Sequence, residues 1–88
     1  MSSHEATLEF DYESPARASI IAESVSREIG EIDDERSQTT IARDGRVVEI
    51  RIDAADGIAL RAALNTWFTL IDVAERTAAI AEGARHEP

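Results

Sequence analysis

The fold is decided by residues 36–53, which read RSQTTIARDGRVVEIRID. Residues 36–43 are rich in β-branched side chains, which favour strands, and Asp44-Gly45 is a favoured two-residue type I′ turn. Residues 46–53 then alternate, so that Val48, Ile50 and Ile52 share one face of a second strand. The stretch predicts a β-hairpin with one apolar face.

A long helix is predicted after the hairpin. Asp56 is a suitable N-cap residue, and helical periodicity continues to about Glu82, with a frayed tail over 83–88. The apolar stripe comprises Leu60, Ala63, Leu64, Trp67, Leu70, Ile71, Ala74 and Ala78. With Phe68 it spans roughly 160°, wider than the ~100° that one sheet face requires. The surplus predicts a helical partner outside the domain.

Residues 7–12 alternate as a strand that places Leu8, Phe10 and Tyr12 on one face. Ser14-Pro15 is an N-cap followed by proline at the first helical position, and an amphipathic helix then runs to about Gly30. Residues 31–35 are predicted to form an acidic loop. The order β-α-β-β-α predicts a single α+β domain over 1–88, ordered over about 6–82. Its three-stranded antiparallel sheet carries two helices on one face.

Charge is the most distinctive feature of the composition. The 88 residues include 18 acidic residues and nine basic ones, all arginine, for a net charge of −9. An acidic, lysine-free surface is typical of proteins adapted to strong salt, where screening mutes self-repulsion. The composition favours a halophilic source over the alternative of an ordinary acidic protein. No apolar run is long enough to cross a membrane, so we expect a cytoplasmic protein.

Few residues suit catalysis. Cysteine is absent, the four glycines are isolated, and His4 and His86 lie in termini expected to be disordered. Residues 33–35 offer carboxylates to a hard cation, but without the spacing of a calcium loop they favour a solvated loop. We therefore expect no catalytic residue, no metal site and no cofactor.

Two sets of residues are candidates for contacts with other molecules. The first consists of four hairpin arginines, which suit RNA phosphates inside a larger assembly or cross-strand pairing with acids such as Glu49. They are Arg36, Arg43, Arg46 and Arg51. The second lies on the helices, where Phe68 at the edge of the apolar stripe is either an interface anchor or part of the core. Ile20, on the polar side of the first helix, extends an apolar patch if the helices lie side by side.

The segment Leu60-Arg61-Ala62-Ala63-Leu64-Asn65-Thr66-Trp67 resembles the Leu-Arg-Ala-x-Leu-Asn-Ser/Thr-aromatic signature in the last helix of the Pcc family. Arg36-Ser37 is similar to the pair that often opens the hairpin in archaeal members. Residues 53–56 resemble their acidic lead into the helix. The resemblance covers residues 6–76, with threonine at position 66 where serine is commoner.

The resemblance implies a non-catalytic role. Members of the Pcc family are the smallest subunit of the KEOPS complex. This complex attaches a threonylcarbamoyl group to the adenosine beside the anticodon in tRNAs that read ANN codons. The resemblance further implies a homodimer that bridges two Kae-type catalytic subunits through its helices. A Bud-type kinase and a Cgi-type subunit would complete the complex. We therefore expect the partner-binding residues to be Ile20, Arg61, Asn65, Phe68 and Asp72, and tRNA to be met only through the assembled complex.

The sequence is also compatible with other functions. The signature favours the principal subunit over its Pcc-like paralogue. An autonomous nucleic-acid-binding module is disfavoured by the net negative charge and the absence of lysine. A small-molecule-binding dimer would need a convergent polar pocket, which the sequence does not indicate.

Overall fold

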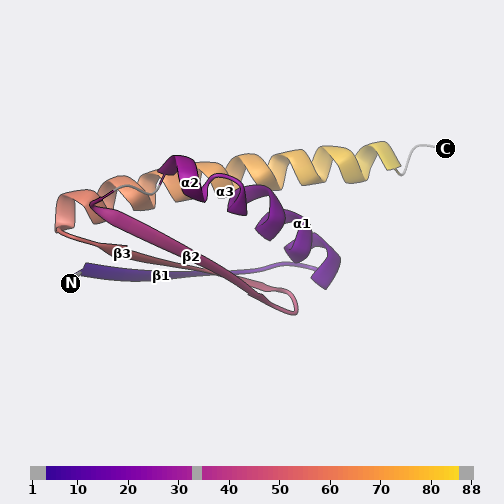
Figure 1. Ribbon diagram of the computed structural model, residues 1–88. Helices are drawn as coiled ribbons and strands as arrows, with labels where there is room; N and C mark the ends of the chain where they lie inside the picture. Colours follow the sequence, from indigo (N-terminus) through magenta and orange to yellow (C-terminus); the bar gives the residue numbers. More distant parts are fainter. Residues whose placement is uncertain (1–3, 33–34, 86–88) are drawn as a thin grey trace.

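The computed structural model describes residues 4–32 and 35–85 (Figure 1). The elements are β1 (His4–Asp11), α1 (Pro15–Ser26), α2 (Ile29–Ile32), β2 (Ser37–Asp44), β3 (Val47–Ala54) and α3 (Gly57–Arg85). This order confirms the predicted α+β class, with α2 as an added short helix.

The three strands form one antiparallel sheet in the order β1-β3-β2, so β3 is central and β1 and β2 are the edges. Leu8 lies opposite Ile50 on β3, and Ile41 lies opposite Ile50 from the other side. Because side chains alternate along a strand, this register places most of the apolar residues of the three strands on one face; Ala42 and Val47 are the exceptions. The opposite, open face carries the polar residues.

Both long helices cover the same face of the sheet (Figure 1). α1 packs over β2 and β3, whereas α3 packs most closely over β3 and β1, and the helices contact each other. α3 has 29 residues, about 43 Å, whereas an eight-residue strand spans only about 27 Å. The helix therefore runs on past the sheet, and the domain is elongated at 53 × 21 × 17 Å.

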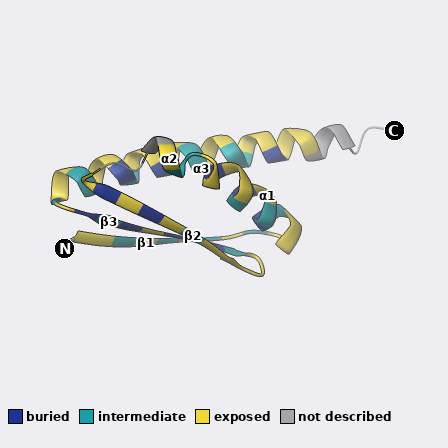
Figure 2. Cartoon of the chain, viewed as in Figure 1, coloured by how far each residue is buried: buried dark blue, intermediate teal, exposed yellow. Residues whose placement is uncertain are grey.

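One core lies between the sheet and the helices, as predicted (Figure 2). Its fully buried side chains come from all layers: Ile21 and Val25 of α1, Val48, Ile50 and Ile52 of β3, and Trp67 of α3. Leu8, Phe10 and Leu64 pack against it from partly buried positions, and Ile71 is buried within it. Every residue of the predicted stripe on α3 is buried or half-buried.

Both predicted N-caps are confirmed. The Ser14 hydroxyl accepts from the amide of Arg17 at 3.1 Å, and an Asp56 carboxylate oxygen accepts from the amide of Ala59 at 2.8 Å. The Ala59 amide, followed by the bond from Arg36, lowers the pKa of Asp56 below its ordinary value of 3.8. The cap therefore works best as a carboxylate.

The prediction of one helix to Gly30 was wrong, because α1 ends at Ser26. The Ser26 hydroxyl donates to the carbonyl of Ala22 at 2.6 Å, and the amide of Glu28 bonds to Val25, three residues back. Such side-chain bonds and tight last turns are common where helices end. α2 then continues the chain, so part of the predicted acidic loop is helical; residues 33 and 34 lie outside the described part.

The ends of several elements also differ from prediction. β1 begins at His4, so this histidine lies in a strand rather than in a disordered terminus. α3 continues to Arg85, beyond the predicted end near Glu82, so residues 83–85 are helical; residues 86–88, including His86, lie outside the described residues. Edge pairing with Ala54 holds His4 in the sheet, which alternation of apolar residues alone did not indicate.

The hairpin turn lies one residue later than predicted. Asp44 pairs with Val47, so the central residues are Gly45 and Arg46. Gly45 has φ of 61°, and no described residue other than glycine has a positive φ. Positive φ at the first central residue alone is the type II′ pattern, which favours Gly-x, and the predicted type I′ turn is wrong.

A polar contact ties the end of β1 to the middle of α3. The Tyr12 hydroxyl donates to a carboxylate oxygen of Glu75 at 2.8 Å. Burial, and then the bond to Glu75, raise the pKa of Tyr12 well above its ordinary range. The tyrosine therefore stays protonated as the donor.

Candidate partner-binding surface

Four of the predicted contact residues lie along one strip of α3, which we call the α3 strip: Arg61, Asn65, Phe68 and Asp72. Their spacing of four, three and four residues aligns them on one side of a helix. All four are exposed. The cap at Asp56 and the burial of Trp67 set the rotation of α3 that turns this strip outward.

Phe68 is the apolar centre of the α3 strip. Its ring stands edge-on to that of Phe10 in β1, with centroids 6.5 Å apart and planes at 81°. The side chain nevertheless keeps 50% of its surface exposed. One edge of the ring thus extends the core over β1, and the rest is available to another molecule. The ring therefore packs partly against the core, and its role as an interface anchor stays a prediction.

The charged groups of the strip are only loosely engaged. Arg76 donates to a carboxylate oxygen of Asp72 at 2.6 Å, one turn apart on an exposed surface. Exposed pairs of this kind contribute about 0.3–0.5 kcal/mol. The pair is therefore weak enough for Asp72 to exchange Arg76 for a group of a partner protein.

Ile20 is not brought to the α3 strip. It is exposed on α1, over the β2 half of the sheet. Phe68 faces β1, on the other flank of α3. The helices do lie side by side, but the two residues do not form one apolar patch.

Three further exposed apolar side chains lie on α3, and the sequence interpretation did not single them out. They are Ile58, 79% exposed, Val73, 52%, and Ile80, 74%. All three lie off the buried stripe, and a helical wheel that marked isolated apolar residues outside the stripe would have found them. Val73 lies on the flank of α3 opposite Phe68, which makes it a natural comparison residue.

The structure does not gather the four hairpin arginines into one patch. Arg36 bonds to the carboxylate of Asp56 at one end of the sheet. Arg46 pairs with Asp11 at 3.7 Å at the other end, where Arg43 donates to the carbonyl of Gly45.

Arg51 lies in the middle of the open face, opposite Thr7 and Thr40. The ion pairs of Arg36 and Arg46 thus use Asp56 and Asp11, whereas Glu49 lies opposite Glu9 and Ala42.

Charge differs sharply between the two layers. The open face carries six carboxylates and one guanidinium: Glu5, Glu9, Asp11, Asp44, Glu49, Asp53 and Arg51. Around the helices the charges whose side chains are described are closer to balance: Arg17, Arg27, Arg61 and Arg76 against Glu13, Glu23, Glu28, Asp72 and Glu75. Glu9 faces Glu49 and Glu5 faces Asp53 directly, which is destabilising for like charges. The acidity of the protein is therefore concentrated on the open face.

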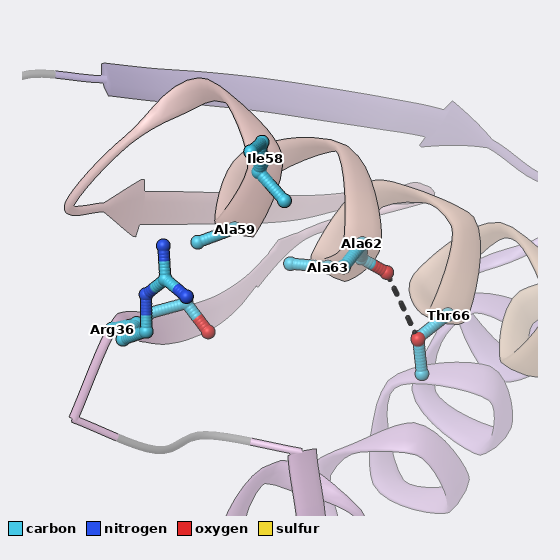
Figure 3. Close-up of a pocket in the computed structure, with 7 residues that line it drawn as sticks. Arg36, Ile58, Ala59, Ala62, Ala63 and Thr66 are labelled. Carbon is cyan, nitrogen blue, oxygen red and sulfur yellow. Dashed lines mark hydrogen bonds between the residues drawn. The ribbon is translucent and has the colours of Figure 1, made fainter.

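A hollow of about 310 Å³ lies between the start of α3 and the start of β2 (Figure 3). Its lining is mostly small and apolar, from Ala59, Ala62 and Ala63, with Ile58 at the rim. The Thr66 hydroxyl is bonded to the carbonyl of Ala62, and the guanidinium of Arg36 extends toward the hollow. The polar groups of this lining are the guanidinium of Arg36 and the hydroxyls of Ser37 and Thr66.

Metal-ligating groups do not converge in the described part of the chain: no three of its histidine, aspartate and glutamate side chains could hold a metal ion together. None of the helices described is both long enough and apolar enough to cross a membrane. The features that stand out in the described residues are the α3 strip with the half-exposed Phe68, the edge strands β1 and β2, and an acidic open face.

These features define the class as a small two-layer α+β domain with both helices on one face of the sheet. Residues 5–79 match the family described as Transcription factor Pcc1, and the chain belongs to this Pcc1 family. It is similar in fold to a chain in the crystal structure of the binary complex Gon7-Pcc1, with a TM-score of 0.70 and 18% sequence identity. That similarity covers 96% of this chain and 98% of the other. A search of curated proteins finds no match.

Proposed function

We propose that this protein is a non-catalytic, dimerising scaffold subunit of the KEOPS complex that holds the Kae-type catalytic subunit through the α3 strip. The complex would form threonylcarbamoyladenosine beside the anticodon of tRNAs that read ANN codons. Membership of the Pcc1 family supports the assignment, as does the likeness to a chain of the Gon7-Pcc1 complex. A Bud-type kinase and a Cgi-type subunit are the further expected partners.

The observation that carries the proposal is the half-exposed Phe68 ring at the centre of the α3 strip. An aromatic ring anchored on one edge by Phe10 is already ordered, so binding costs little side-chain entropy. Arg61, Asn65 and Asp72 surround it with polar groups, which is the arrangement of an interface anchor with a polar rim. Two helices of a partner packed along α3 would bury this ring by ridges-into-grooves contacts.

The proposal gives tRNA contact to the assembled complex rather than to this chain. The net charge of −9 repels phosphates, and Arg36 and Arg46 are engaged with carboxylates. Residual contacts through Arg43 or Arg51 would then be made only beside a basic partner. A cytoplasmic location and a halophilic archaeal source belong to the same proposal, as does the principal subunit rather than its paralogue.

Phe68→Asp tests the proposal, with Val73→Asp as its matched control. Both side chains are about half exposed on opposite flanks of α3, and both variants add one negative charge. A charge placed in a desolvated interface costs several kcal/mol, which is orders of magnitude in affinity. We expect Phe68→Asp to lose the Kae-type partner in a pull-down at high salt, while Val73→Asp keeps it. Arg61→Ala and Asn65→Ala should weaken binding less, by about 1–3 kcal/mol each.

Circular dichroism and light scattering on the same variants separate binding from folding. A folded, dimeric Phe68→Asp that binds the partner with wild-type affinity would show that the α3 strip is not the interface. If Phe68→Asp melts far below Val73→Asp and loses dimer and partner together, Phe68 is a core residue. A filter-binding assay in which the isolated protein retains RNA or DNA would favour an autonomous nucleic-acid-binding module instead.

A further inference from the structure

We propose that a hollow on the open face of the sheet binds an arginine side chain from a basic segment of a partner protein. The hollow lies at the hairpin end of the sheet and has a volume of about 260 Å³. Both helices cover the other face, so this site is separate from the α3 strip and does not depend on the proposed function. The lining residues come from all three strands: Glu9 of β1, Ala42, Arg43 and Asp44 of β2, and Val47 and Glu49 of β3.

The floor of the hollow is apolar. Ala42 lies opposite Glu49, and Val47 lies opposite Asp11 and Asp44, so the register assigns both apolar side chains to the open face. They are the exceptions on a face that otherwise carries charged and polar residues in the described strands. Ala42 is exposed and Val47 is half-buried. An alkyl chain can therefore lie on the sheet here without covering polar groups.

The carboxylates around this floor have no cation of their own. Glu9 and Glu49 face each other directly across β1 and β3, and Asp44 ends β2 beside them. In the described part of the chain, no ion pair or hydrogen bond joins these three carboxylates to another residue. The neighbouring Asp11, by contrast, pairs with Arg46 at 3.7 Å. Like charges held opposite each other are destabilising, so a cation that binds between them relieves this repulsion.

The nearest arginines of the chain do not supply that cation. Arg43 lies opposite Val48, which assigns its side chain to the core face of β2, and its guanidinium donates to the carbonyl of Gly45 at 2.9 Å. Arg51 lies on the open face, two residues beyond Glu49, and does not line the hollow. The compensating charge is therefore left to another molecule.

An arginine side chain matches this lining. Its alkyl stem can lie on Ala42 and Val47 while its charged head reaches the carboxylates, as long basic side chains commonly do. The guanidinium presents several donors in a planar fork, so it can bond Glu9 and Glu49 at once, whereas an ammonium is a more strongly hydrated point charge.

The size and the charge of the site favour a protein segment as the source of the arginine. Pockets for whole small molecules usually measure about 300–1,000 Å³ and enclose most of the ligand. A smaller, exposed hollow suits one side chain of a larger partner instead. The net charge of −9 attracts a basic segment toward this face and repels nucleic acid.

Peptide binding to two matched variants tests the site. Glu9→Gln and Glu5→Gln each remove one charge from the open face of β1, and each residue faces a carboxylate of β3, Glu49 or Asp53. Of the two, only Glu9 lines the hollow. The probe is a rhodamine-labelled nonapeptide of alternating glycine and arginine, titrated by fluorescence anisotropy in KCl at a concentration where circular dichroism shows an intact fold. We expect Glu9→Gln to raise the Kd about fivefold, and Glu5→Gln to raise it by less than about twofold.

A second pair of variants leaves the charge unchanged. Ala42→Ile places a larger side chain in the hollow, whereas Thr40→Ile places the same side chain two residues away, on the same face and outside the lining. We expect Ala42→Ile to raise the Kd about fivefold as well, with Thr40→Ile close to wild type. The same peptide with citrulline in place of arginine keeps the shape of the side chain without its charge, and we expect it not to bind.

Several outcomes would overturn the site. Equal losses from Glu9→Gln and Glu5→Gln would assign binding to net charge, and wild-type affinity of Ala42→Ile would place the peptide elsewhere. A wild-type protein that binds neither peptide, or binds the citrulline peptide equally well, would contradict the proposal outright. A lysine peptide that binds as tightly would overturn the choice of arginine. The pull-down with Phe68→Asp concerns the other face of the sheet, so the two proposals can fail separately.

Discussion

Trp67 is the residue at which the two layers meet. Its indole is fully buried, and the ring nitrogen donates to the Thr39 hydroxyl of β2 at 3.1 Å. A buried donor of this kind costs free energy when it has no acceptor, so Thr39 is as important to the core as its apolar neighbours. The bond also fixes the rotation of α3, and that rotation turns Phe68 toward β1.

Thr39→Val should therefore destabilise the protein although it keeps the volume of the side chain. Removing the acceptor leaves the indole N–H unsatisfied, at a cost of about 1–3 kcal/mol in the free energy of unfolding. Urea unfolding at constant m-value measures the loss. Thr40→Val, the exposed neighbour on the same strand, should stay within about 0.5 kcal/mol of wild type. Equal behaviour of the two variants would show that the bond contributes nothing.

The sequence predicted which residues are buried better than it predicted their polar contacts. The stripe on α3 and the alternation of β3 follow from periods of 3.6 and 2, which side-chain direction imposes locally. The bond from Trp67 to Thr39 depends on the register of β2 on β3 and on the rotation of α3, and both are tertiary. Phe68 was identified as a residue at the edge of the stripe, but its contact with Phe10 likewise needed the packed structure.

At the scale of the elements, the N-terminus of α3 depends on a single carboxylate. Asp56 caps the helix through Ala59 and holds Arg36, where β2 begins. The backbone also joins these two segments, because the amide of Ala55, just after β3, donates to the carbonyl of Arg36 at 2.8 Å. One side chain thus joins the end of the hairpin to the start of the long helix.

Asp56→Asn should change how stability responds to acid. The pKa of Asp56 lies below its ordinary value of 3.8 in the folded protein, so the carboxylate stabilises the fold above that pH. Its contribution disappears as pH falls through the folded pKa. We expect the wild type to be more stable than Asp56→Asn near pH 7 and the difference to shrink steadily below about pH 4. Urea midpoints measured from pH 7 to pH 3 would contradict this if the difference stayed constant.

Element ends were the part of the fold that local patterns described least well. Ile29 continues the apolar spacing of α1, so periodicity alone does not show that Ser26 ends the helix. Asp44-Gly45 has the composition of a type I′ turn, but the pairing of Asp44 with Val47 moves the turn to Gly45-Arg46. In both places a hydrogen bond or a sheet register decided between two locally acceptable structures.

At the scale of the whole molecule, the separation of charge explains several observations together. Nearly balanced charges around the helices leave that layer able to approach a protein partner, whereas the open face is strongly acidic. The open face is also where like charges meet directly, at Glu9 and Glu49. In dilute buffer this repulsion opposes the compact state, while at about 1 M salt the Debye length falls to about 3 Å and screens it.

Stability should accordingly rise from dilute buffer to molar KCl. Glu9→Gln removes one member of the Glu9–Glu49 pair and should stabilise the protein by up to about 1 kcal/mol in dilute buffer. Because salt screens the same repulsion, that gain should vanish in molar KCl. Asp72→Asn changes the net charge equally but breaks the exposed pair with Arg76, so it should not stabilise the fold. Circular dichroism gives the melting temperatures of the wild type, Glu9→Gln and Asp72→Asn across the KCl series. A melting temperature of the wild type that is flat or falls with salt would contradict the salt adaptation. Equal gains in melting temperature from Glu9→Gln and Asp72→Asn would assign the effect to net charge rather than to the open face.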